Sequence, residues 1–127
     1  MIKINFYHKC GFKLSSGQEK RIIGELKKIF TDIKNPAIID ISFIGKEEIK
    51  QLNQKHRQIN RATDTLSFPL YENLAEIKIA SEKINPLHLG EIIICPEFVN
   101  FGFEKIMLLT RHSARHLIGK HHRLLPE

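Results

Sequence analysis

Tryptophan is absent from the 127-residue chain, and cysteine occurs only at Cys10 and Cys95. Two cysteines so far apart form neither a disulfide framework nor a paired-cysteine metal knuckle, and they favour a reducing compartment. No apolar run approaches the length of a membrane span, and the first residues lack the apolar core of a signal peptide. We therefore expect a cytoplasmic protein that has no membrane segment.

The bulk composition indicates one globular domain, which we place over residues 1–127. Hydrophobic residues make up 42% of the chain and charged residues 27%, a balance typical of folded domains that bury a core without disulfides. The net charge is +6 and the pI is about 9.4. Such a charge favours a polyanionic partner such as nucleic acid, although it also simply aids solubility.

Hydrophobic periodicity predicts alternating strands and helices. Apolar and polar residues alternate over 2–6, and β-branched or apolar runs occupy 37–44, 63–70 and 89–95, so we expect strands there. Helical spacing predicts helices from Ser15 or Ser16 to about Lys34, and over 46–53. The segment 71–87 has no clear pattern and is either a weak helix or a loop. This order predicts an α/β (α+β) fold in which a small mixed sheet packs against helices.

The last predicted helix begins at Pro96, which suits a first helical position, and runs to about Ile118. Its core face has apolar residues at helical spacing, among them Phe103 and Ile106. Gly102 falls inside the helix and makes its start uncertain, whereas Gly119 is a natural terminator.

Four of the seven histidines lie between positions 112 and 122. His112 and His116 are four residues apart, so a helix places their imidazoles on one face, where both can hold one metal ion. Gly119 can then turn the chain back and bring a third histidine, His121 or His122, to the same ion. Three nitrogen ligands leave a tetrahedral zinc ion one position for water, which the metal activates near neutral pH. The predicted metal site therefore lies at the end of the C-terminal helix.

The histidine spacing is also typical of two other arrangements. A pair spaced by four is common on solvated helix faces, where it binds anions at most. The spacing also resembles the HExxHxxGxxH signature of metzincin peptidases, but Ser113 replaces the glutamate that serves as their general base. Peptide hydrolysis is therefore not expected.

Three segments together resemble the YbeY family of bacterial metal-dependent endoribonucleases. The C-terminal family motif HGxLHLxGYDH is matched at His112, His116, Leu117, Gly119 and His122. The family's LN…R…TDVLSFP corresponds to LN at 52–53, Arg57 and TDTLSFP at 63–69, and its LGDIVIS corresponds to LGEIIIC at 89–95. These segments occur in the family order and span about residues 52–122.

The resemblance implies one zinc ion per chain, or another divalent transition metal, held by His112, His116 and His122. It also implies cleavage of RNA, with ribosomal RNA and the small ribosomal subunit as partners in rRNA maturation and ribosome quality control. Ser113 stands where the family has glycine, and His121 stands where it has aspartate. His121 is our candidate proton acceptor, because a histidine there can take a proton or compete for the metal.

Arg57 is the candidate phosphate-binding residue, because a guanidinium binds two phosphate oxygens at once. Further basic residues flank Arg57 or the histidines, and we expect them to form a cationic cleft around the metal; they are Lys55, Arg61, Arg111, Arg115, Lys120 and Arg123. With aromatic residues at only 8%, the composition predicts no stacking platform for reading an RNA sequence.

Two functions from different classes remain. The first is a single-strand-acting, metal-dependent endoribonuclease with an open three-histidine zinc site. The second is a non-catalytic RNA- or ribosome-binding protein in which a fourth ligand, such as His121, closes a structural zinc site.

Overall fold

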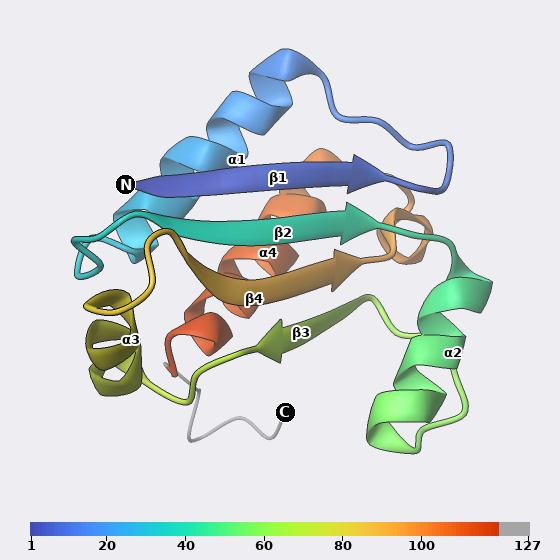
Figure 1. The fold of residues 1–127 in the computed structure, drawn as a ribbon. Helices are drawn as coiled ribbons and strands as arrows, with labels where there is room; N and C mark the ends of the chain where they lie inside the picture. The colour runs from blue at the N-terminus through green and yellow to red at the C-terminus, as the bar shows by residue number, and fades with distance from the viewer. Residues whose placement is uncertain (120–127) are drawn as a thin grey trace.

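A computed structural model describes residues 1–119 of the chain (Figure 1). The elements, in chain order, are β1 (Ile2–His8), α1 (Ser16–Ile29), β2 (Ala37–Phe43), α2 (Lys46–Arg57), β3 (Thr65–Pro69), α3 (Leu74–Ser81), β4 (Leu87–Ile94), the 3-10 helix η1 (Pro96–Val99) and α4 (Phe103–Leu117). The predicted order of strands and helices is confirmed. The described residues contain no helix that is both long and apolar enough to cross a membrane.

The four strands form one mixed sheet in the order β1-β2-β4-β3. β1, β2 and β4 are parallel neighbours, whereas β3 pairs antiparallel with β4 at one edge. Figure 1 shows α1 and α4 side by side behind the sheet, with α2 at one end of the strands and α3 at the other. The mixed sheet packed with helices confirms the predicted fold class.

The main hydrophobic core lies between the sheet and the two helices behind it. Alternate residues of β2, including Ile39 and Ile41, are fully buried there with Ile22 and Leu26 of α1. The intervening positions of β2 face the other side and carry polar groups, so that Asp40 accepts a hydrogen bond from Asn5 and pairs with His88. A smaller core lies under α2, where Ile49 packs with residues of β3 and β4.

The first helix begins as predicted but ends earlier than expected. Ser15 caps it through a reciprocal pair of hydrogen bonds with Gln18, a capping box. The helix ends at Ile29 and not near Lys34, because the chain tightens at Phe30 and forms a turn that closes from the Ile33 amide to the Phe30 carbonyl. That turn buries Ile33 in the core. Burying this side chain stabilises the fold more than a further turn of helical hydrogen bonds would.

The prediction of one continuous helix from Pro96 is wrong over its first turns. Pro96 does start a helix, but it is the short η1, and the next residues Asn100 and Phe101 adopt left-handed backbone conformations with φ of 51° and 60°. Two such residues cannot continue a right-handed helix. Gly102 therefore lies at the N-cap of α4 and not inside the helix.

The segment without a clear pattern contains α3, which Asn73 caps by accepting a hydrogen bond from the Glu76 amide at 2.9 Å. β4 begins at Leu87, two residues before the predicted start. Within β4, Gly90 has φ of +146° at an irregularity in the pairing with β2. A Cβ atom there would lie 2.5 Å from the Phe68 carbonyl and 2.9 Å from the Leu117 side chain, so glycine lets α4 approach the β3–β4 edge closely.

Candidate active site

α4 presents His112 and His116 on one face, as their spacing predicts. Their ring centroids are 4.4 Å apart with an interplanar angle of 63°. The opposite face of the helix is buried in the core, and its residues are Ile106, Met107, Thr110, Ser113, Ala114 and Leu117. Because that face is fixed by packing, the two imidazoles are directed toward the edge strand β3.

Hydroxyl groups connect α4 to the edge of the sheet at this point. The Thr65 hydroxyl donates to the Ile93 carbonyl oxygen at 2.9 Å, and it lies 3.1 Å from the Ser113 hydroxyl. Since the single proton of Thr65 is already donated to Ile93, Ser113 must be the donor to Thr65. Ser113 is only 1% exposed, so this bond lies in the interior and fixes the helix between the two histidines.

His116 has a second contact that orients its ring. The Ser67 hydroxyl lies 3.5 Å from Nδ1 of His116. When Nδ1 carries the proton and donates it to Ser67, Nε2 keeps its lone pair for a metal ion. Ser67 therefore has the position of a residue that selects the tautomer of a metal ligand.

A cleft of about 740 Å³ lies in front of the histidines. It is bounded by the C-terminal end of α2, by β3 and by the C-terminal half of α4. Its lining residues are His56, Arg57, Thr63, Asp64, Thr65, Leu66, Ser67, Phe68, Leu109, His112, Ser113 and His116. Arg57 and the two histidines, which are more than fifty residues apart in sequence, thus open onto one cavity.

Arg57 is the last residue of α2, and the following turn is held in place by Asn53. The Asn53 side-chain Nδ2 donates to the Arg61 carbonyl at 2.9 Å, while the backbone carbonyl of Asn53 accepts from the Ile59 amide. His56 beside Arg57 meets the edge of the Phe68 ring, with centroids 5.0 Å apart, and this contact joins α2 to β3. A guanidinium at a helix C-terminus is also favoured by the helix dipole.

The expected ring of basic residues is only partly present around the cleft. Arg111 and Arg115 line a different hollow between α1 and α4, and Arg111 approaches Glu25 at 3.9 Å. They are one residue before each histidine, so the 100° rotation per residue turns them toward α1. Among the described lining residues, Arg57 is the permanent cation and Asp64 the carboxylate; the predicted contributions of Lys120 and Arg123 lie outside the described residues.

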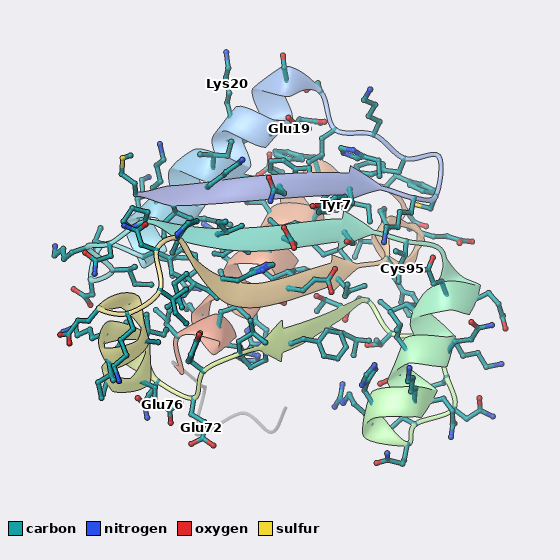
Figure 2. The ribbon with its side chains drawn as sticks, in the orientation of Figure 1. Tyr7, Glu19, Lys20, Glu72, Glu76 and Cys95 are labelled. Carbon is teal, nitrogen blue, oxygen red and sulfur yellow. The ribbon has the colours of Figure 1, made fainter. Side chains whose placement is uncertain are left out.

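α4 ends as predicted, close to the last described residue. Gly119 has φ of +81°, and a Cβ atom there would lie 2.4 Å from the Glu72 carbonyl oxygen, so only glycine fits this turn against the start of α3. Glu72 and Glu76 lie together on this side of the molecule (Figure 2). His121 and His122, the predicted proton acceptor and third metal ligand, lie outside the described residues.

The donor chemistry of the described residues fits two of the three predicted metal bonds. No group of three histidine, cysteine, aspartate or glutamate side chains suited to a metal ion occurs within residues 1–119. His112 and His116 provide two imidazole nitrogens on adjacent helical turns, beside an open cleft, which is the arrangement that zinc accepts from a helix.

Some lining residues were not identified from the sequence. His56 adjoins Arg57 and could have been noticed for that reason, but nothing in the sequence indicates its contact with Phe68. Thr65 and Ser113 both depart from the family pattern, in which valine and glycine stand at these positions, and only their proximity reveals that the two changes form one hydrogen bond.

Cys95 follows β4 (Figure 2) and is fully buried. Burial raises the pKa of its thiol, which keeps the group protonated and unreactive.

Comparison with known proteins places these features in one family. The family model described as endoribonuclease YbeY matches residues 13–125. A relative from Thermodesulfovibrio yellowstonii is 34% identical over 126 residues, covering 81% of this chain and 74% of its own length, and one from Staphylococcus aureus is 34% identical over 106 residues, covering 77% and 68%. A relative from Thermoanaerobacter sp. is 38% identical over 98 residues; the match covers 66% of this chain and 60% of that protein. All three are named endoribonuclease YbeY.

A solved structure supports the same fold. The solution structure of a Thermotoga maritima protein is 29% identical, covers 92% of this chain and 71% of its own chain, and superposes with a TM-score of 0.52.

Proposed function

Because the chain belongs to the YbeY family, we propose that it is a metal-dependent endoribonuclease that hydrolyses phosphodiester bonds of single-stranded RNA in the cleft. The observation that carries this proposal is the meeting of Arg57 with His112 and His116 in one open cavity. A phosphate-binding cation and a pair of metal-binding imidazoles are components that a metal-dependent nuclease can use on a phosphodiester.

In this proposal His112, His116 and His122 hold one zinc ion, or another divalent transition metal. When bound, such a metal activates water as a nucleophile at neutral pH. Arg57 binds the phosphate and orients it, and Ser67 keeps the His116 ring in the tautomer that offers Nε2. The bond between Ser113 and Thr65 keeps α4 at a fixed distance from β3, so that the histidines and the bound phosphate stay aligned.

His121 is proposed as the group that accepts a proton from the attacking water, in the place of the family's aspartate. A neutral imidazole has a nitrogen lone pair that can accept a proton. We further propose, from the family, that the substrate is ribosomal RNA, that the small ribosomal subunit is a partner, and that the protein acts in the cytoplasm in rRNA maturation and ribosome quality control.

The alternative, a non-catalytic RNA- or ribosome-binding protein with a structural zinc site, is disfavoured by the cavity. Structural zinc sites are closed by four protein ligands, whereas a volume of about 740 Å³ beside the two histidines leaves room for a substrate. Arg57 can bind RNA phosphate under either function, so the cleavage assay separates the two.

An RNA cleavage assay tests this proposal. Purified protein should cleave a single-stranded RNA, lose activity after treatment with EDTA and regain it when zinc or manganese is added. His116→Ala should be inactive, whereas His88→Ala, which removes an exposed histidine on the opposite face of the sheet, should cleave normally. RNA left intact by the metal-loaded wild type would contradict the proposal, as would equal activities of the two variants.

A further inference from the structure

Aromatic rings gather at the end of the sheet where β1 and β2 finish, away from the cleft. Phe43 of β2 stacks on His8 with centroids 5.3 Å apart, and Phe12 contacts Phe43 at 5.4 Å. Phe12 also stacks on Phe101, with centroids 6.2 Å apart and an interplanar angle of 26°. This series of rings leads from the buried Phe43 to the surface, where Phe101 is 54% exposed. A large exposed phenyl ring thus rests on a rigid base.

A second exposed ring belongs to the same turn. Phe98 of η1 is 42% exposed, and the Lys46 ammonium lies over its ring at 5.2 Å from the centroid. A cation over the face of an aromatic ring is attracted to it and is also well placed to meet a phosphate. We call Phe98, Phe101 and Lys46 the aromatic platform.

The backbone of the turn between η1 and α4 holds these rings in place. Asn100 and Phe101 have positive φ values, which non-glycine residues adopt only at a cost in free energy. Three short hydrogen bonds maintain the turn, from the amides of Asn100, Phe101 and Gly102 back to residues of η1. A strained turn that places a phenyl ring in water removes stability, and such features are typical of binding sites.

Both basic and acidic residues lie near the platform in sequence. Lys9, Lys13 and Lys105 are exposed and adjoin the ring series in sequence, in addition to Lys46. Of the acids that are near in sequence, Glu104 is paired with Arg21 at 2.9 Å, Glu97 is exposed beside Phe98, and Glu47 and Glu48 are exposed after Lys46. The feature that favours an anionic ligand is the Lys46 ammonium over the exposed Phe98 ring, because bases of single-stranded nucleic acid stack on flat rings and their phosphates pair with cations.

We propose that the aromatic platform binds unpaired bases of the same single-stranded RNA whose backbone is cleaved in the cleft. This inference rests on the proposed function for the identity of the ligand. The platform would bind any base, because every base has a flat face, and would therefore extend the RNA contact without reading a sequence.

The two sites are close enough for one RNA strand. Both adjoin α4, and the helical rise from Phe103 to His112 is about 14 Å, a distance that a few extended nucleotides cover. Leu108 of α4 is exposed, and its neighbour Leu109 lines the cleft. A protein partner is less well matched, because the exposed groups of the platform are two rings and an ammonium and include no aliphatic side chain.

The test is RNA binding in EDTA, where cleavage does not interfere. The probe is a fluorescein-labelled single-stranded RNA of about 12 nucleotides, followed by anisotropy at low salt, and a second probe of about 4 nucleotides is too short to reach both sites. The double variant Phe98→Ala/Phe101→Ala should bind the long RNA about tenfold more weakly and should lose less affinity for the short RNA, because a short RNA held in the cleft does not reach the platform. Ile79→Ala removes a comparably exposed apolar side chain from α3 and should bind both as the wild type does.

Replacing both rings by leucine distinguishes stacking from general apolar contact. Leucine keeps apolar area but has no flat face, so Phe98→Leu/Phe101→Leu should resemble the alanine variant. Wild-type binding of the long RNA by the alanine variant would overturn the proposal, and full binding by the leucine variant would overturn base stacking as the contact, because leucine has no flat face. These outcomes are independent of the nuclease assay: RNA that binds through the platform but is never cleaved would contradict the proposed function alone.

Discussion

The hydrogen bond between Ser113 and Thr65 offers a sharp test of how α4 is fixed against β3. We consider Thr65→Val and Ser113→Ala, which remove one hydroxyl each and nearly preserve side-chain volume. The two oxygens are 3.1 Å apart, and Thr65 donates its own proton to the Ile93 carbonyl. The two single variants therefore have different consequences, because one removes an acceptor and the other removes a donor.

Thr65→Val leaves the Ser113 hydroxyl buried without its acceptor, and an unmade buried hydrogen bond costs about 1–3 kcal/mol of unfolding free energy. The lower end applies when Ser113 turns to the carbonyl four residues earlier in α4. Ser113→Ala leaves the bond from Thr65 to Ile93 intact, so its cost should be about 0.5–1.5 kcal/mol. In the double variant both hydroxyl groups are absent, so neither is left buried without its partner. The loss of unfolding free energy in the double variant should therefore be about 1 kcal/mol smaller than the sum of the losses in the two single variants.

Urea unfolding of the wild type and the three variants measures this coupling. Thr110→Val is the matched control, because its buried hydroxyl donates to the Ile106 carbonyl at 2.7 Å within α4 and not to β3. Combined with Thr65→Val, it should give additive costs within about 0.5 kcal/mol. Additive costs for Thr65→Val and Ser113→Ala as well would refute the reasoning that this bond joins the helix to the strand.

Three further predictions concern the cleft and its C-terminal end. Arg57→Ala should weaken RNA cleavage while metal content and unfolding temperature stay unchanged, and Arg57→Lys should recover only part of the rate because an ammonium cannot bind two oxygens in a planar pair; wild-type cleavage by the alanine variant would make Arg57 a bystander. His121→Ala should retain metal and cleave about 10²–10⁴-fold more slowly, as expected for loss of a proton acceptor, and His121→Asp should keep activity. A joint fall in zinc affinity and stability would instead identify His121 as a fourth ligand. Gly119→Ala should destabilise the fold by about 1–3 kcal/mol in thermal or urea unfolding, because its Cβ would lie 2.4 Å from the Glu72 carbonyl. Gly24→Ala, in the middle of α1 with no atom within 4 Å of the added carbon, should be neutral or stabilising, and equal costs for the two would contradict the steric argument.

Local signals in the sequence were sufficient for the strands and for the pair of histidines on α4. Strand positions follow from short β-branched runs, and the shared face of His112 and His116 follows from helical geometry alone. Gly119 was recognisable because a helix that turns back at its end favours glycine. The segments around Arg57 and the histidines could be assigned to one site through the family motifs, since no local pattern indicates that they meet.

What the sequence did not reveal depends on tertiary contacts. The early end of α1 reflects the burial of Ile33, and the break before α4 reflects the turn at Asn100 and Phe101, neither of which has a local signature. Arg111 was expected near the metal from its position in the chain, yet a rotation of one residue directs it toward Glu25. Which site a charged side chain belongs to therefore depends on the residues that it meets in the folded structure.

The metal content of the purified protein tests the central claim most directly. Elemental analysis of the wild type, of His116→Ala and of the control His88→Ala, each loaded with zinc and then desalted, measures the ions bound per chain. A three-histidine site predicts about one zinc ion per chain in the wild type and in His88→Ala, and most of that metal lost in His116→Ala. A wild type that binds no zinc or other transition metal, or a His116→Ala variant that keeps the full amount, would contradict the assignment of this site.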